Sequence, residues 1–134
     1  MLLTIENVTK SFTGAEAPVP VLRGVDLSLA RGETLALTGE SGSGKSTLLH
    51  LVAGLDTVDG GSIRLDGRDI ARMDDRGRAA LRRDTVGVIF QQFNLIPSLD
   101  VAANIAFQAR LAGRHDPARA TELAGSLGLG PHLR

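Results

Sequence analysis

The sequence predicts an α/β fold built from a β-rich N-terminal part, a central strand, loop and helix, and a mainly helical C-terminal part. Apolar residues partly alternate with polar ones over residues 2–12, as in a strand. After residue 100 the apolar residues follow a helical spacing and are preceded by residues that start helices. Between these parts, a glycine-rich stretch at residues 39–44 separates a short apolar run from a helix-compatible segment. This order indicates a phosphate-binding α/β layer with attached pieces.

The N-terminal part is expected to contain two strands. The first covers residues 2–12 and ends at a loop that runs from Thr13 to Pro20. In the second, Val25, Leu27 and Leu29 alternate with polar residues, which is typical of a half-buried strand.

The central part supplies the strand, loop and helix. The run Thr34–Thr38 (TLALT) ends at Gly39 and predicts a strand that is buried on both faces. The segment Lys45–Ala53 contains no helix breaker and is followed by Gly54, a residue suited to a helix C-terminus. The glycine-rich loop therefore leads directly into the start of a helix.

The remaining elements alternate in type. Asp66-Gly67 is a strong turn dipeptide after a short strand, and Asp116-Pro117 combines an N-cap with a first-turn proline. The full expectation is a strand at Ser62–Leu65, a charged helix at Asp74–Arg83, a buried strand at Val86–Phe90, a helix at Asp100–Leu111 and a last helix after Pro117.

Composition excludes several classes of function. The 134 residues have a formal net charge of zero, 43% hydrophobic and 22% charged residues, which is typical of a globular domain and gives no basic field for nucleic acid. Cysteine is absent, so disulfides and thiol chemistry are excluded. The three histidines lack metal-ligand spacing, and no apolar run is long enough to span a membrane. We expect a cytoplasmic chain that reaches a membrane only through a partner.

The glycine-rich stretch carries the clearest motif. Residues 39–46 (GESGSGKS) match G-x-x-x-x-G-K-[ST] between a predicted strand and a helix, which is the context of a phosphate-binding P-loop. Glycines let backbone N–H groups turn toward phosphate oxygens. Lys45 can reach the β- and γ-phosphates, Ser46 can bind Mg²⁺, and Thr47 adds a hydroxyl near the α-phosphate. The expected nucleotide-binding residues of the motif are Gly39, Glu40, Ser41, Gly42, Ser43, Gly44, Lys45, Ser46 and Thr47.

Kinases, GTPases and transport ATPases share this motif, so further residues are needed to choose among them. The stretch RGETLALTGESGSGKSTLLHLVAGLDTVDGGSIRLDG resembles the ABC-transporter ATPases along its entire length. TIENVTKSFTG before it and VGVIFQQFNLIPSLDVAANIAF after it resemble the same family, in the same order. The segments GESGSGKST and FQQFNLIPSL look closest to the export-type branch that serves lipoprotein release, macrolide or peptide efflux and FtsX-like permeases.

The resemblance implies an incomplete P-loop NTPase fold of the ABC-ATPase type, with an antiparallel N-terminal β part, a P-loop core and the start of a helical subdomain. It divides the chain into a core at residues 1–92 and a Q-loop and helical part at 93–134. Bound ATP and Mg²⁺ are the implied cofactors. A transmembrane permease, FtsX-like or MacB-like, and a second ATPase subunit in a head-to-tail dimer are the implied partners. The chain would then lie at the inner face of the plasma membrane.

Three sites follow from the resemblance, each with a plainer alternative. Phe12 matches the aromatic residue that stacks on adenine, although it could be an ordinary core residue at a strand end. Gln91 matches the Q-loop glutamine that reaches Mg²⁺ and the attacking water, with Gln92 as the competing choice. The apolar loop Phe93–Leu99 matches the region that receives the permease, although it could instead fold onto its own core.

The family pattern includes an LSGGQ signature, an apolar strand that ends in Asp-Glu, and a switch histidine, and these 134 residues contain none of them. We therefore expect nucleotide binding without hydrolysis from this chain alone, and ATPase activity in a full-length subunit. The alternatives are a genuinely short nucleotide-binding protein and, less in keeping with the Q-loop segment, a small-molecule kinase with a P-loop.

Overall fold

The computed structural model describes residues 1–133. The chain forms two compact units, Met1–Arg82 and Arg83–Arg134, and each is described by itself. The sequence suggested a functional division at residues 92–93, and that division stays a prediction.

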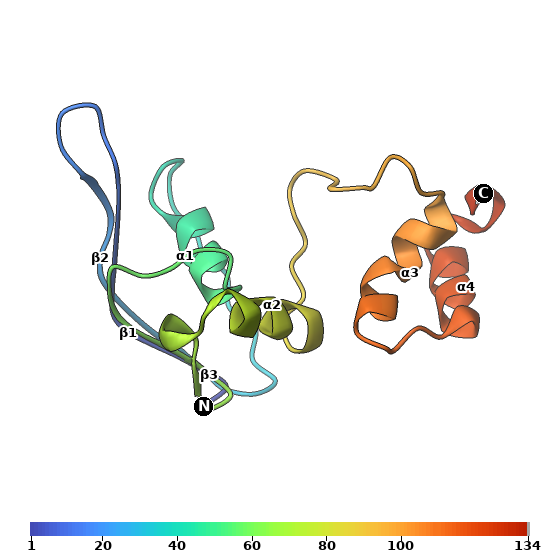
Figure 1. Ribbon diagram of the computed structural model, residues 1–134, viewed down its shortest axis with the longest axis horizontal. Coiled ribbons are helices and arrows are strands. Elements are labelled where there is room, and N and C mark those ends of the chain that lie inside the picture. Colours follow the sequence, from blue (N-terminus) through green and yellow to red (C-terminus); the bar gives the residue numbers. More distant parts are fainter. Residues whose placement is uncertain (134) are drawn as a thin grey trace. The chain divides into compact units, whose positions relative to one another are not determined.

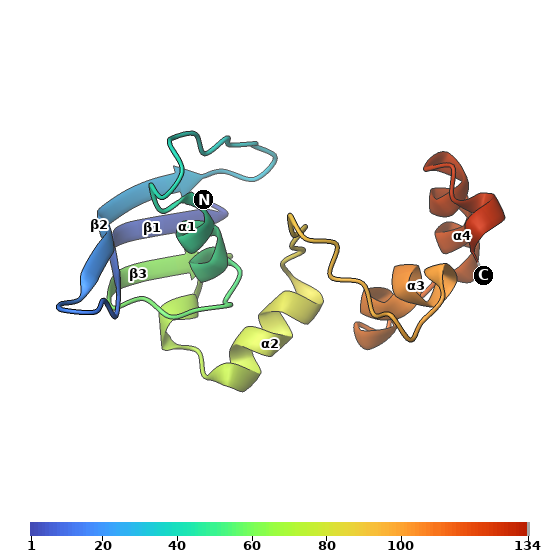
Figure 2. The ribbon, with the colours of Figure 1, turned by 90° about the horizontal axis from the view of Figure 1, so that it is seen from above.

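A four-stranded antiparallel sheet forms the base of the first unit (Figures 1 and 2). The strands are arranged in the order β2-β1-β3-β4. The two predicted N-terminal strands and the predicted strand before Asp66-Gly67 are confirmed. Their bounds are β1 Leu3–Phe12, β2 Val19–Leu29, β3 Gly60–Leu65 and β4 Arg68–Asp69.

The turn between β3 and β4 has the geometry that its sequence predicts. Asp66 has φ of 50° and Gly67 has φ of 78°, so both central residues are left-handed. A two-residue hairpin loop of this kind matches the twist of its strands, and Asp-Gly is among the pairs that adopt it most readily. After β4 the chain continues through a short 3-10 helix, η1 (Ile70–Arg72).

Helix α1 (Lys45–Val52) and all but the last two residues of α2 (Asp75–Asp84) complete the first unit. Its fully buried side chains are Ile5, Val8, Leu51, Ile63 and Leu81, so strands and both helices contribute to one core. The end of α1 is held to α2, because the Arg82 guanidinium donates a hydrogen bond to the carbonyl of Gly54. Gly54 follows α1 with φ of 71°, as its predicted place at a helix C-terminus requires.

The second unit contains α3 (Val101–Leu111), α4 (Pro117–Ser126) and the 3-10 helix η2 (Gly130–His132). Both predicted helix starts are confirmed. Asp100 accepts a hydrogen bond from the Ala103 N–H at 2.7 Å, and Asp116 caps α4 ahead of Pro117.

Two predictions are wrong: neither Thr34–Thr38 nor Val86–Phe90 forms a strand in the part of the chain that the structure describes. Both segments are also largely exposed, with Leu35 at 47% and Ile89 at 100% of full exposure. An apolar run becomes a strand only when a neighbouring strand accepts and donates its backbone hydrogen bonds. No described strand pairs with either segment, so both stay irregular.

Over the described residues, the helices are all too short or too polar to cross a membrane.

Candidate functional site

The glycine-rich loop adopts a backbone that requires glycine. Gly39, Gly42 and Gly44 have φ of 153°, 81° and 96°, within the region where an L side chain is strained. At Gly44 space is limiting as well, because a Cβ there would lie 2.9 Å from Leu22 Cδ2 and 3.2 Å from Val21 Cγ1. The loop therefore passes closely over β2 just before α1 begins.

Lys45, the first residue of α1, turns back over the loop. Its ammonium group donates hydrogen bonds to the carbonyls of Gly39 and Glu40, at 2.8 and 2.6 Å, and to the Ser43 hydroxyl at 3.0 Å. One cation thus holds three acceptors of the same loop. A more strongly charged acceptor placed inside the loop would compete for this ammonium group.

A hollow of about 610 Å³ opens at the start of α1. Gly44 is the N-cap of α1 and no side chain caps the helix, so the first-turn N–H groups are open to an external acceptor. Such a helix end attracts anions through both its free donors and its dipole. The hollow is lined by Val21, Ser41, Gly42, Gly44, Lys45, Ser46 and Thr47.

Phe12 is the last residue of β1. It pairs with Val19, two residues along β2 from Val21, which lines the hollow. At the usual rise of a strand, two residues span about 7 Å. The ring is 42% exposed, so the structure places it as an accessible aromatic group rather than as a core side chain.

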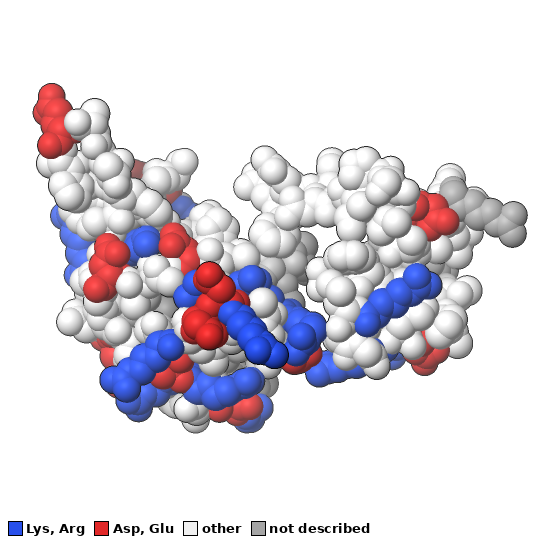
Figure 3. Space-filling model, viewed as in Figure 1, with Lys and Arg blue, Asp and Glu red and all other residues white. Residues whose placement is uncertain are grey.

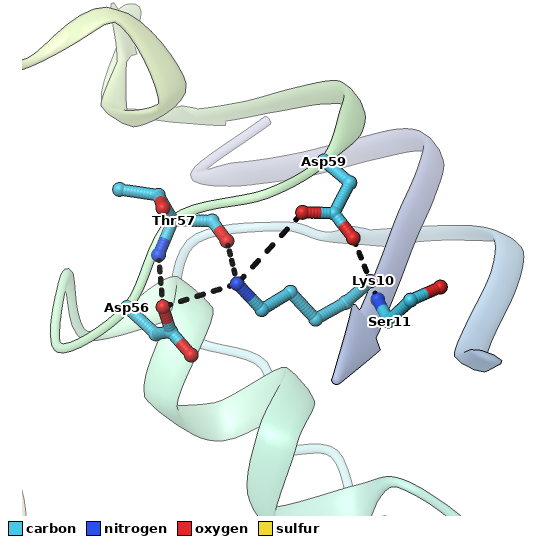
Figure 4. A network of polar contacts seen from close by, with 5 residues as sticks. All are labelled: Lys10, Ser11, Asp56, Thr57 and Asp59. Atoms are coloured by element: carbon cyan, nitrogen blue, oxygen red, sulfur yellow. Dashed lines mark hydrogen bonds and ion pairs between the residues drawn. The ribbon is translucent and has the colours of Figure 1, made fainter. Parts of the chain in front are cut away.

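Lys10, whose ammonium group lies over the Phe12 ring, is the centre of a polar network that sequence reasoning missed. Figure 4 shows this network. The ammonium group of Lys10 donates to the Thr57 carbonyl at 2.7 Å and to Asp56 at 3.2 Å, and lies 3.9 Å from Asp59. Asp59 also accepts a hydrogen bond from the Ser11 N–H at 2.6 Å. A lysine in a strand is ordinarily solvent-facing, and nothing in the sequence pairs this one with acidic residues about fifty positions later.

The network lowers the pKa of Asp56 below its ordinary value of 3.8. The main cause is the hydrogen bond from the Thr57 N–H, followed among the lowering effects by the hydrogen bond and the charge of Lys10. Partial burial opposes them. Asp56 therefore stays ionised, and keeps its attraction for Lys10, to a lower pH than an ordinary aspartate.

Gln91, Gln92 and the loop Phe93–Leu99 belong to the second unit, and the two glutamines are exposed. Residues 85–99 contain no charged residue, and in this stretch Ile89, Phe93 and Leu95 are 100%, 91% and 65% exposed. We name residues 85–99 the uncharged segment. The approach of Gln91 to the hollow stays a prediction.

Asn104 of α3 organises the end of the uncharged segment. Its side-chain carbonyl accepts from the Ile96 N–H at 2.8 Å, and its amide donates to the carbonyls of Leu99 and Asp100 at 3.0 and 2.9 Å. Asn104 is a second residue that the sequence did not single out, because its role depends on the conformation of the loop it binds.

In the view of Figure 3, basic and acidic side chains lie next to one another mainly over the first unit. Over the described residues, no group of three or more His, Cys, Asp or Glu side chains is placed to hold a metal ion. A divalent cation at the hollow would therefore depend on oxygens from a ligand in addition to the Ser46 hydroxyl.

Comparison with known proteins agrees with this geometry. Residues 22–133 match the family model described as ABC transporter. The chain is 42% identical to the lipoprotein-releasing system ATP-binding protein LolD 1 of Rhodopirellula baltica, over 96% of this chain and 57% of that protein. It is also 42% identical to the macrolide export ATP-binding/permease protein MacB of Marinobacter nauticus, over 98% of this chain and 21% of MacB.

Among solved structures, the fold is similar to the dimeric post-hydrolysis state of the ATP-binding cassette MJ0796 bound to ADP and Pi. The TM-score is 0.85 at 33% identity, and the match covers 92% of this chain and 56% of that one. The chain thus spans little more than half of the cassette and of LolD 1. The family match and the shared fold show that the chain belongs to the ABC transporter family, as part of its ATP-binding domain.

Proposed function

We propose that the chain is the nucleotide-binding part of an ABC-transporter ATPase that binds Mg-ATP and drives an export-type permease of the lipoprotein, macrolide or peptide class. The observation that carries the proposal is the hollow at the start of α1. An uncapped helix N-terminus, three left-handed glycines and a loop-bound lysine surround it. That arrangement suits a chain of phosphates.

Each residue of the loop has a proposed part in binding. Gly39, Gly42 and Gly44 keep side chains away from the phosphates, while Glu40, Ser41 and Ser43 supply backbone N–H groups of the same loop. Lys45 exchanges its carbonyl acceptors for the β- and γ-phosphates, which carry full charge and bind an ammonium group more strongly. Thr47 donates its hydroxyl to the α-phosphate.

Ser46 is the proposed Mg²⁺ ligand at the loop, together with Gln91 from the uncharged segment. One hydroxyl fits Mg²⁺ in this setting, because the ion commonly keeps several waters and takes only one or two protein ligands beside phosphate oxygens. Bound Mg²⁺ would neutralise phosphate charge during hydrolysis. Gln91 would position the attacking water in a full-length subunit, with Gln92 as the neighbour to test beside it.

Phe12 is the proposed platform for adenine. Its ring is accessible, and its strand partner Val19 lies two residues along β2 from Val21 in the wall of the hollow. Stacking of a base on an aromatic ring contributes about 1–3 kcal/mol and does not select strongly among bases.

For the uncharged segment we propose a role in docking the permease. An exposed apolar stretch without charge is costly on a lone domain and is typical of a protein-binding surface. A full-length subunit would then lie on the cytoplasmic side of the membrane, pair head to tail with a second subunit, and hydrolyse ATP. For Met1–Arg134 alone we propose binding without hydrolysis.

Calorimetric titration of Met1–Arg134 with Mg-ATP tests the binding role. Lys45→Ala removes a charge-assisted contact and should weaken binding about tenfold or more. Arg72→Ala is the matched control, since it removes an 88% exposed cation of the same unit and should leave the affinity unchanged. Equal affinities in all three proteins would refute the proposed site.

Co-purification tests the docking role, using the longest chain encoded by the open reading frame that contains these residues. The double variant Phe93→Ala and Leu95→Ala should lose an FtsX-like or MacB-like permease encoded nearby. Leu111→Ala, at a leucine that is 55% exposed on α3, should retain it. Retention of the permease by both variants would remove this role from the uncharged segment.

A further inference from the structure

We infer that Lys10 is the positioning residue that sets the Phe12 ring beside the phosphate loop, an inference that rests on the proposed role of Phe12 as the adenine platform. Lys10 is the only charged side chain buried among the described residues, at 8% exposure. A buried ammonium group is unfavourable unless nearby oxygens compensate it. The role of this buried charge can therefore be inferred from the groups that Lys10 contacts.

The first contact is with the segment that follows α1. This segment, residues 56–59, accepts hydrogen bonds from Lys10 at Asp56 and Thr57. Two hydrogen bonds of Asp59 also join it to β1. The Asp59 N–H donates to the Thr9 carbonyl at 2.9 Å, and its carboxylate accepts from the Ser11 N–H. Figure 4 shows the contacts of Lys10 and Ser11, and together with Thr9 three successive residues of β1, ending one residue before Phe12, are fastened to this segment.

Helix α1 connects the phosphate loop to the segment that Lys10 binds. Its first residue, Lys45, belongs to the phosphate loop, and its C-cap, Ala53, precedes the segment held by Lys10 by three residues. A helix of this length behaves as a stiff element, because its backbone hydrogen bonds fix every residue. Fastening the far end of α1 to β1 consequently fixes the distance from the phosphate loop to the end of β1, where Phe12 lies.

The second contact is with the ring itself. The Lys10 nitrogen lies over the Phe12 ring, 5.4 Å from its centroid. This cation–π contact covers one face of the ring and limits its rotation. A base can then stack only on the opposite face. Lys10 accordingly controls both where the ring lies and which face it offers.

A purely structural role for Lys10 would make a different prediction. Loss of stability alone would weaken every ligand of the folded unit in the same proportion. A positioning role acts through Phe12, so it affects only ligands that carry a base. Mg-ATP and Mg-tripolyphosphate separate the two cases, because tripolyphosphate presents a similar chain of phosphates without adenine.

The experiment measures the Kd of Met1–Arg134 for both ligands in the wild type, Lys10→Met, Phe12→Ala and the double variant. Methionine keeps much of the apolar length of lysine and removes the charge. Lys10→Met should weaken ATP binding about two- to fivefold and leave tripolyphosphate binding unchanged. In the Phe12→Ala background the same change should have no further effect on ATP.

Equal weakening of both ligands by Lys10→Met, or a continued loss of ATP affinity when Phe12 is already alanine, would overturn the inference. If Lys10→Met does not fold, Asp59→Asn replaces it. That isosteric change loosens the clamp while Lys10 stays in place, and it should weaken ATP alone; unchanged ATP affinity would overturn the inference. A wild type that binds neither ligand refutes the proposed function itself. A wild type that depends on Phe12 but not on Lys10 for ATP refutes only the positioning role.

Discussion

The glycine at the start of α1 allows a sharp test of the loop geometry. Gly44→Ala should destabilise the first unit in two ways. Alanine at φ of 96° incurs about 1–2 kcal/mol of backbone strain. Its Cβ would also lie 2.9 Å from Leu22 Cδ2, 3.2 Å from Val21 Cγ1 and 3.3 Å from the Val21 carbonyl oxygen. Crowding of this kind adds about 1–3 kcal/mol, for a total near 2–5 kcal/mol.

Gly42→Ala is the matched control for this substitution. Gly42 has φ of 81°, but a Cβ at this position would meet no atom within 4 Å, so only the backbone strain remains. Urea unfolding of the two variants should therefore place Gly44→Ala below Gly42→Ala by about 1–3 kcal/mol. Equal free energies of unfolding would show that the loop does not pass closely over β2, and would refute the reasoning.

Three further substitutions test other parts of the structure. Asn104→Ala removes the hydrogen bonds that hold residues 96–100 and should cost about 1–3 kcal/mol locally, seen as faster hydrogen exchange of the Ile96 amide; unchanged exchange would contradict it. Because the pKa of Asp56 is lowered in the folded protein, its ionised form stabilises the fold above its ordinary value of 3.8, and this stabilisation is lost as the pH falls below that value. From about pH 5 to pH 3 the free energy of unfolding should therefore fall further in the wild type than in Asp56→Asn. Parallel pH profiles would contradict that. Leu81→Ala, at 1% exposure, should cost about 2–5 kcal/mol in denaturant unfolding, against under about 0.5 kcal/mol for the 73% exposed Leu127→Ala, and similar losses would contradict the assigned core.

Local signals in the sequence predicted local structure well. Asp66-Gly67 specified a hairpin turn, and Asp100 and Asp116-Pro117 specified helix starts, because each acts on backbone groups within a few residues. The phosphate loop was predictable for the same reason. The hydrogen bonds of its lysine go to residues 39–43, although the packing of Gly44 against β2 depends on residues about twenty positions earlier.

Features that depend on distant partners were not predictable. TLALT and VGVIF have the composition of buried strands, yet strand formation requires a second strand, and their own residues do not specify one. Lys10 presents the converse case. Its neighbours in the sequence predict a solvent-exposed residue in a strand. In the folded protein it instead lies close to Asp56, Asp59 and the ring of Phe12.

The most direct test of the central claim is thermal unfolding of Met1–Arg134 with and without Mg-ATP, in the wild type and in Lys45→Ala. A ligand that binds only the folded form stabilises it by about 2.7 kcal/mol at a hundredfold excess over Kd. We predict a higher midpoint in the wild type with Mg-ATP, without phosphate release, and a much smaller shift in Lys45→Ala at the same concentration. An unchanged midpoint in the wild type, or an equal shift in Lys45→Ala, would contradict nucleotide binding at the phosphate loop.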